Sequence, residues 1–337
     1  MQRVIFVVGN SRSGTTMMGR VLGGHPRVHT FNELHFFEQL WQPTPTPEPI
    51  DRAEAILLAG TLLTIERDGY YTQGNPATYR EEAERIVAAI NGEPLTPPRV
   101  YAGFIDYECA GHGKTIGCDQ TPRNLYYIRE LLDLYPEARF VVMVRDPRDV
   151  MLSQKNRWKR RRLGAKGTPW WNALRTWAGY HPITISLLWR SGIAAGDAFA
   201  EDPRVCVLRF EDLLADPEKQ MRRVCEVVGL TYDPGMLDVP RVGSSHQADR
   251  PAERGLDPSA AGRWKLGGLT QTELAICQRL AGEAMARHRY PLEPIAPPPL
   301  ALVWCRLTWL LKSSLAFALN FRRVKHLRES LRRRLAS

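Results

Sequence analysis

The sequence lacks the cysteine pairs and the long apolar runs that mark two common classes of protein. Its cysteines, at positions 109, 118, 206, 225, 277 and 305, are scattered and include no C-x-x-C pair. We therefore expect reduced, mostly structural cysteines in a cytoplasmic protein. No stretch reaches about 18 uncharged apolar residues, and no signal peptide precedes the first expected strand, so a clear transmembrane span is not expected.

Acidic residues are scarce towards the C-terminal end. The 337-residue chain has 46 Lys and Arg against 36 Asp and Glu, a net charge of +10. Residues 301–337 hold nine Lys or Arg and one acid, so this segment carries +8 and the rest of the chain only +2. The basicity belongs to a tail, and we expect no nucleic-acid partner. The length fits one large α/β domain or two small ones.

The N-terminal residues have the pattern of a phosphate-binding loop. Val4 to Val8 is an apolar, β-branched run that predicts a buried strand, and a helix is expected from Thr15. The residues between, Gly9 to Gly14, are small and polar. In this order, backbone amides and the helix dipole converge on an anion. The alternative is a glycine-rich turn that holds no ligand.

This loop lacks the lysine of the nucleotide triphosphatase motif G-x-x-x-x-G-K-[ST]. Gly9 and Gly14 have the right spacing and Thr16 takes the hydroxyl position, but Thr15 stands at the lysine position. The one cation in the loop is Arg12. The sequence thus predicts a phosphate-like ligand rather than a Mg²⁺-triphosphate.

Strands and helices alternate along the chain. Strands are expected at 4–8, 28–31, 114–119, 139–144 and 205–210, and helices follow most of them. This pattern predicts an α/β fold, a P-loop-like three-layer sandwich with a central, mainly parallel sheet and helices on both faces. Residues 41–110 are expected to be a helical insertion, with helices at 51–66 and 79–91, that shapes an acceptor cleft. Ligands bind at the carboxyl ends of such strands, where Glu33, Asp119 and Arg145 also lie.

A second anion site is expected after the fourth strand. Arg145 stands at the strand end, Ser153 about two turns into the next helix, and Arg157 one turn further on the same face. Two guanidinium groups and a hydroxyl can close on a phosphate. Alternatively, Arg145 pairs locally with Asp146 or Asp149, and Ser153 is a surface residue.

With both sites in view, the sequence resembles the sulfotransferases that use 3′-phosphoadenosine 5′-phosphosulfate (PAPS). The first motif of that family matches Asn10 to Thr16, and the second matches Arg145 to Ser153. His25-Pro26 and Glu33 resemble the branch of tyrosylprotein and bacterial carbohydrate-type sulfotransferases. The resemblance covers about residues 1–40, 112–160 and 203–290.

The resemblance implies transfer of the PAPS sulfuryl group to an acceptor hydroxyl, release of adenosine 3′,5′-bisphosphate, and no metal. The catalytic residues would be Glu33, as general base, and Arg12, which stabilises charge on the sulfuryl group. The implied PAPS-binding residues are Ser11, Arg12, Ser13, Gly14, Thr15, Thr16, Arg145, Ser153, Arg157, Ser245 (or Ser244) and Arg263. Gln120 stands where the family often has Lys and is a candidate sulfate contact, and Phe210 replaces a usual Tyr. Without the resemblance, Glu33 reads as an exposed acid that begins a helix.

The C-terminal segment has a different character from the rest of the chain. A sulfotransferase domain over 1–293 is expected to end at a Pro-rich linker, 294–300, followed by an amphipathic basic helix over 301–337. Together with the seven cations of residues 155–166, this helix predicts contact with the inner face of a membrane and a lipid-linked or anionic acceptor. The alternatives are a helix docked on its own domain or on a second subunit, and a single transmembrane span.

The sequence leaves two rival functions open. One is a P-loop kinase or NTPase in which Asp119 binds Mg²⁺, and the missing loop lysine argues against it. The other is a non-catalytic, nucleotide-binding, membrane-associated protein, for which Gln120 in place of lysine is the one indication.

Overall fold

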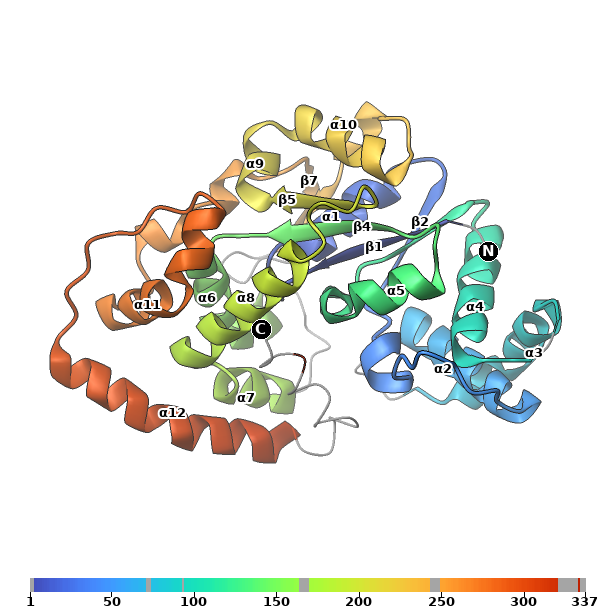
Figure 1. The fold of residues 1–337 in the computed structure, drawn as a ribbon, viewed down its shortest axis with the longest axis horizontal. Coiled ribbons are helices and arrows are strands. Elements are labelled where there is room, and N and C mark those ends of the chain that lie inside the picture. Colours follow the sequence, from blue (N-terminus) through green and yellow to red (C-terminus); the bar gives the residue numbers. More distant parts are fainter. Residues whose placement is uncertain are drawn as a thin grey trace.

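The computed structural model describes residues 3–70, 74–92, 94–163, 170–242, 249–320 and 333. Five strands form one parallel sheet in the order β2-β3-β1-β4-β5 (Figure 1). They are β1 (Val4–Gly9), β2 (Val28–Phe31), β3 (Ile116–Asp119), β4 (Arg139–Val144) and β5 (Val205–Arg209). Every residue of central β1 is buried, as its continuous apolar run requires.

Helices cover both faces of the sheet. On one face α1 (Thr15–Gly23), α9 (Phe210–Ala215) and α10 (Pro217–Val228) pack against the odd-numbered side chains of β1, such as Ile5 and Val7. On the other face the even-numbered side chains of β1 meet α4 (Pro97–Gly111), α5 (Ile128–Leu134) and α8 (Pro182–Asp197). The expected three-layer α/β fold is confirmed.

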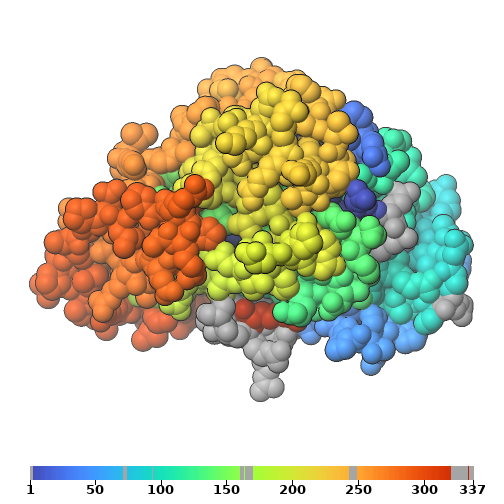
Figure 2. All heavy atoms as spheres, turned by 45° about the horizontal axis from the view of Figure 1, so that its top comes forward, coloured from blue at the N-terminus to red at the C-terminus, as the bar shows by residue number. Residues whose placement is uncertain are grey.

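The segment after β2 is helical and lies at one end of the molecule (Figures 1 and 2). It comprises η1 (Phe36–Leu40, a π-helical turn), α2 (Arg52–Asp68), η2 (Pro76–Tyr79), α3 (Arg80–Ala89) and α4. The sequence pattern predicts α2 and α3. It does not predict α4, which begins with two prolines, Pro97 and Pro98, that break helix interiors but are tolerated in a first turn.

The C-terminal elements α11 (Gln271–Arg287) and α12 (Pro299–Asn320) lie at the opposite end (Figures 1 and 2). The remaining helices are η3 (Pro122–Tyr127), α6 (Pro147–Lys155), η4 (Arg157–Arg162), α7 (Trp170–Ala178), η5 (Pro234–Leu237), η6 (Pro258–Ala260) and η7 (Arg263–Leu266). A hairpin of β6 (Pro240–Arg241) and β7 (Arg250–Arg254) lies outside the main sheet. Helix α6 begins with Pro147 in its first turn, and the side chain of Asp146 accepts a hydrogen bond from the amide of Arg148.

The six cysteines are all free, and all but Cys305 are buried. Within the described ranges, α12 is the one helix with the length and composition to cross a membrane, and 6% of its apolar window is buried. Its two cations, Arg306 and Lys312, leave α12 within the composition of a candidate membrane span. The sequence pattern alone predicts no clear span.

Candidate functional site

The loop between β1 and α1 has a backbone that only glycine can adopt at two positions. Gly9 and Gly14 have φ angles of 151° and 96°, and a Cβ atom on either would lie 2.5 Å from Met143 O or from the ring of Phe210. Arg12 also has a positive φ, 77°, which is strained for a non-glycine residue. The loop is therefore a tight turn that leads into the N-terminus of α1, where backbone amides suit an anion.

A cavity of about 340 Å³ opens beside this loop. Its walls combine the loop, the start of α1, the ends of β2 and β4, α6, and the β6–β7 hairpin. Of the residues that the sequence predicts, those on its wall are Ser11, Arg12, Gly14, Thr15, Thr16, Glu33, Arg145, Ser153, Arg157 and Arg263. The wall holds seven arginines and two acids, so it suits a ligand with more than one negative charge.

Arg12 joins the two predicted anion sites. Its Nε donates a hydrogen bond of 3.0 Å to Oγ of Ser153 on α6, 141 positions away in the sequence. The Nη1 of Arg145 donates to the carbonyl oxygen of Arg12 at 3.2 Å. The loop and the second motif thus form one continuous surface of donors.

Arg145 lies at the end of β4 with its side chain 13% exposed, and it stacks on Phe210, whose ring centroid lies 4.3 Å from its guanidinium carbon. Burial lowers the pKa of Arg145, and Asp149, 4.0 Å away, opposes this. In the described part of the chain its Nε is buried without a hydrogen-bond partner. A buried donor at a cavity wall fits a bound anion. Arg145 therefore does pair locally with Asp149, but this pairing does not use its Nε donor.

Glu33 follows β2, and its side chain is 41% exposed at the cavity. Nε2 of His35 lies 3.3 Å from its Oε2. Partial burial acts to raise the pKa of Glu33, but His35 and the positive charges of Arg157 and Arg123 outweigh this, so the pKa lies below its usual range. Glu33 is therefore an ionised carboxylate at neutral pH, as a general base must be.

His35 is held in place by its surroundings. It has a positive φ of 51°, and its amide donates to Oγ1 of Thr121 at 3.3 Å. Its ring packs against that of Tyr70, with centroids 4.3 Å apart. The sequence gives no sign of this role beyond the two-residue spacing from Glu33.

Three predicted residues lie off the cavity wall or outside the description. Ser13 is fully buried, and its amide donates to the carbonyl of Asn10. Gln120 is also buried and packs on Gly19 of α1, and its Oε1 has no hydrogen-bond partner among the described residues. Ser245, with its neighbour Ser244, lies outside the described residues.

The cavity wall includes three arginines that the sequence reading missed, Arg20, Arg241 and Arg250. Arg20 lies one helical turn after Thr16, a spacing that could have indicated it. Its Nη1 donates to the carbonyl of Val242 and so ties α1 to the hairpin. The other two belong to the β6–β7 hairpin, which is too short to leave a periodic pattern.

Asp119, the Mg²⁺ ligand of the kinase alternative, is not available to a nucleotide. It is fully buried, and its oxygens accept hydrogen bonds from Tyr101, Thr121 and Asn124. Burial raises the pKa of its carboxyl. Asp119 therefore fixes the end of β3 and does not face the cavity wall.

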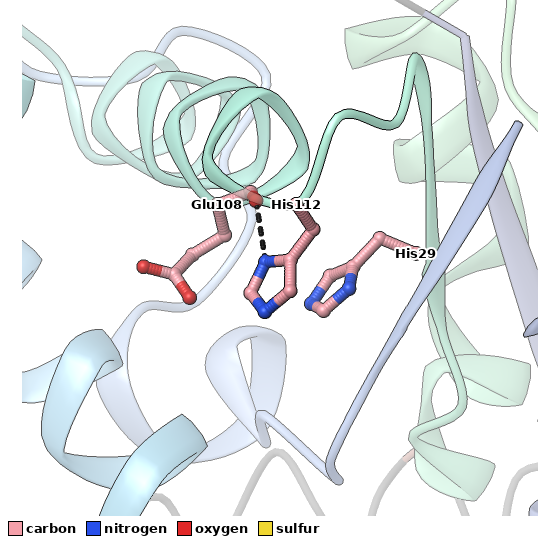
Figure 3. A group of neighbouring side chains, drawn as sticks. All are labelled: His29, Glu108 and His112. Atoms are coloured by element: carbon pink, nitrogen blue, oxygen red, sulfur yellow. Dashed lines mark hydrogen bonds between the residues drawn. The ribbon is translucent and has the colours of Figure 1, made fainter.

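His29, Glu108 and His112 have the residue types of a metal site and lie close together (Figure 3). However, Arg67 holds the carboxylate of Glu108 at 2.8 Å. The two imidazole rings stack at 4.1 Å with an angle of 21°, so their in-plane lone pairs do not aim at a common point. We assign this group the role of joining α4 to β2.

Residues 4–234 match the sequence profile of a family described as "Sulfotransferase family". Nodulation protein NoeE of Sinorhizobium fredii is 24% identical over 241 residues, which cover 68% of this chain and 50% of that protein. Omega-hydroxy-beta-dihydromenaquinone-9 sulfotransferase Stf3 of Mycobacterium tuberculosis is 31% identical over 250 residues, which cover 67% of this chain and 62% of that protein. The chain thus spans between half and two thirds of the length of these two relatives.

A solved structure, the sulfotransferase domain from the curacin biosynthetic pathway, has a similar fold. It superposes with a TM-score of 0.52 at 18% identity, over 87% of this chain and 99% of that domain.

Proposed function

The chain belongs to the sulfotransferase family, and on that premise we propose that it transfers the sulfuryl group of PAPS to an acceptor hydroxyl and releases adenosine 3′,5′-bisphosphate. The observation that carries this proposal is the contact between Arg12 and Ser153. Two anion sites, about 130 positions apart in sequence, share one arginine-lined cavity. That arrangement fits a nucleotide with phosphates at both its 5′ and 3′ positions better than a linear triphosphate.

The positions of these residues on the cavity wall support the following binding roles. The loop amides, Thr15 and Thr16 hold the 5′-phosphosulfate at the N-terminus of α1. Ser153 and the unpartnered Nε of Arg145 hold the 3′-phosphate. Arg12 lies between these two groups of residues and offsets the negative charge of both the 5′-phosphosulfate and the 3′-phosphate.

Glu33 starts the chemistry by taking the proton of the acceptor hydroxyl. The hydroxyl oxygen forms a bond to sulfur, and the bond from sulfur to the bridging phosphate oxygen breaks. The electron pair of that bond leaves with adenosine 3′,5′-bisphosphate. Arg12 stabilises the negative charge that develops on the sulfuryl and bridging oxygens. The protein contributes positioning and a fixed positive field.

We assign the reaction to residues 1–293, with 41–110 shaping the acceptor cleft, 294–300 as linker and 301–337 as a basic helix. The relative Stf3 is named for a hydroxylated menaquinone, which supports a lipid-linked hydroxyl as acceptor here. The basic C-terminal segment supports a cytoplasmic position at the inner face of a membrane. The excess of arginine on the cavity wall also suits an anionic acceptor.

An acceptor screen with sulfur-labelled PAPS tests this function. The full chain is incubated, with a metal chelator present, with panels of lipid, glycan and phenolic hydroxyls. We expect label on one class of hydroxyl and formation of adenosine 3′,5′-bisphosphate in equal amount. Transfer of phosphate from Mg²⁺-ATP to the same panels, without sulfate transfer, would contradict the proposal.

A further inference from the structure

Helix α12 is attached to the body of the protein by polar contacts along one side. Nε1 of Trp309 donates to Oγ1 of Thr184 at 2.9 Å, and Nζ of Lys312 donates to the carbonyl of Tyr180 at 3.3 Å. These bonds reach α8 and the end of α7, so they fix the rotation of α12 about its axis. The helix lies along the outside of the molecule, beside α7 (Figure 1).

The other side of α12 is apolar and faces outwards. Its exposed side chains include Val303, Trp304, Leu307, Leu310, Leu311 and Leu315, which recur at helical spacing. Trp304 is 69% exposed and Leu311 is 74% exposed. A helix that packs on a soluble protein normally buries its apolar residues, so the exposed apolar side of α12 is unusual.

Helix α7 packs beside α12 and also exposes apolar side chains. Trp170, Trp171 and Trp177 are each about half exposed. Nζ of Lys312 lies 4.6 Å from the ring centroid of Trp177, which places α12 beside this residue of α7. We call the exposed tryptophans of α7 and the outer side chains of α12 the α7–α12 surface.

We propose that the α7–α12 surface docks onto an anionic lipid bilayer, with α12 lying in the plane of the interface. Tryptophan beside leucine suits the boundary between headgroups and acyl chains. Residues 155–166, which lead towards α7, and 321–337, which follow α12, each carry seven Lys or Arg. Such flanks attract anionic headgroups, whereas they would repel the same flanks of a second copy.

The surface lies close to the candidate active site. Ser153 and Arg157 are on the cavity wall, and Arg157 begins η4, which packs against α7. One short helical element therefore separates the cavity from the bilayer. An acceptor hydroxyl on a lipid could reach Glu33 without leaving the membrane. This last step rests on the proposed function, whereas the docking itself does not.

Vesicle flotation of the full chain tests the docking. Vesicles of phosphatidylcholine with phosphatidylglycerol are compared with phosphatidylcholine alone, with no nucleotide present. We expect binding to the anionic vesicles, and a loss of at least about tenfold for Leu311→Glu and for Trp171→Ser. Leu266→Glu and Leu57→Glu are matched controls, because both leucines are exposed but lie on other elements, and they should bind as the wild type does.

Binding of adenosine 3′,5′-bisphosphate is measured on every variant and should not change. That readout separates a failed docking proposal from a failed sulfotransferase proposal. Equal vesicle binding by Leu311→Glu and wild type would overturn the docking. A dimer in solution that Leu311→Glu converts to monomer, without vesicle binding, would show a second copy as the occupant. Resistance of the wild type to alkaline extraction would show a spanning helix instead.

Discussion

The Nε of Arg12 and the Oγ of Ser153 lie 3.0 Å apart, although 141 positions separate them in the sequence. Arg12 occupies a strained backbone conformation in the loop after β1, and Ser153 is buried in α6. The contact joins the two motifs, so a phosphate bound at one site should change the affinity of the other site for its phosphate. Because of it, the two motifs act as one binding site.

This contact predicts coupled effects in a double-mutant cycle. Ser153→Ala and Arg12→Met should each weaken binding of adenosine 3′,5′-bisphosphate by about 10- to 100-fold, the usual range for hydrogen bonds to a charged group. The double variant should lose less than the product of the two, because each side chain positions the other. Titration calorimetry measures all four proteins, with Thr61→Ala on α2 as a control. Strict additivity would contradict the coupling.

The assignment of Glu33 as general base predicts a separation of binding from chemistry. Glu33→Gln should lower the rate of sulfate transfer by about 10²- to 10⁴-fold, since the amide cannot accept the proton. Affinity for adenosine 3′,5′-bisphosphate should stay the same. Glu226→Gln, an exposed acid on α10, serves as the matched control. Full activity in Glu33→Gln would reject the assignment.

His35 is predicted to set the acid limb of the pH profile. Activity requires ionised Glu33 and is lost as the pH falls through its pKa, which His35, Arg157 and Arg123 hold below the usual range. His35→Phe keeps an aromatic ring but removes the contact, so the pKa should rise and activity should be lost at a higher pH. His35→Gln keeps an N–H donor and should restore much of the wild-type profile. The readout is kcat/KM against pH, and identical acid limbs in all three proteins would refute the role.

The buried hydrogen bonds of Asp119 predict a stability effect. Tyr101 donates to its Oδ2 at 2.8 Å, and both residues are fully buried. Tyr101→Phe should lower the free energy of unfolding by about 1–3 kcal/mol, because a buried acceptor loses a partner. Tyr107→Phe is the control, since its hydroxyl contacts Glu82 near the surface and its loss should cost about 0.5 kcal/mol or less. Denaturant unfolding measures both, and equal midpoints for Tyr101→Phe and wild type would count against the assignment.

Elements with a complete local signal were predictable from the sequence. Helix α10 is an example, since Pro217 begins it and Gly229 ends it with a φ of 67°. The strands β1 and β4 are likewise largely continuous apolar runs. Helix α4 was missed because Pro97 and Pro98 disguise its start.

The directions in which the side chains of the site point could not be predicted from the sequence. Spacing brings Arg12 and Ser153 to one crevice, but neither their hydrogen bond nor the positive φ of Arg12 can be predicted from spacing. Gln120 lies beside Gly19 rather than on the cavity wall, a result of how α1 packs on the end of β3. The apolar character of α12 could be predicted from the sequence. That α7, with its tryptophans, packs beside α12 could not, because this depends on tertiary packing.

We propose that the cavity binds a nucleotide by its 5′ and 3′ phosphates together. Calorimetry with a metal chelator, comparing adenosine 3′,5′-bisphosphate with adenosine 5′-monophosphate, measures what the 3′-phosphate contributes. We predict that the 3′-phosphate strengthens binding by at least about tenfold, as a charge-assisted contact should, and that Ser153→Ala removes most of this gain. Equal affinity for the two nucleotides, or tighter binding of Mg²⁺-ATP when metal is restored, would contradict the account.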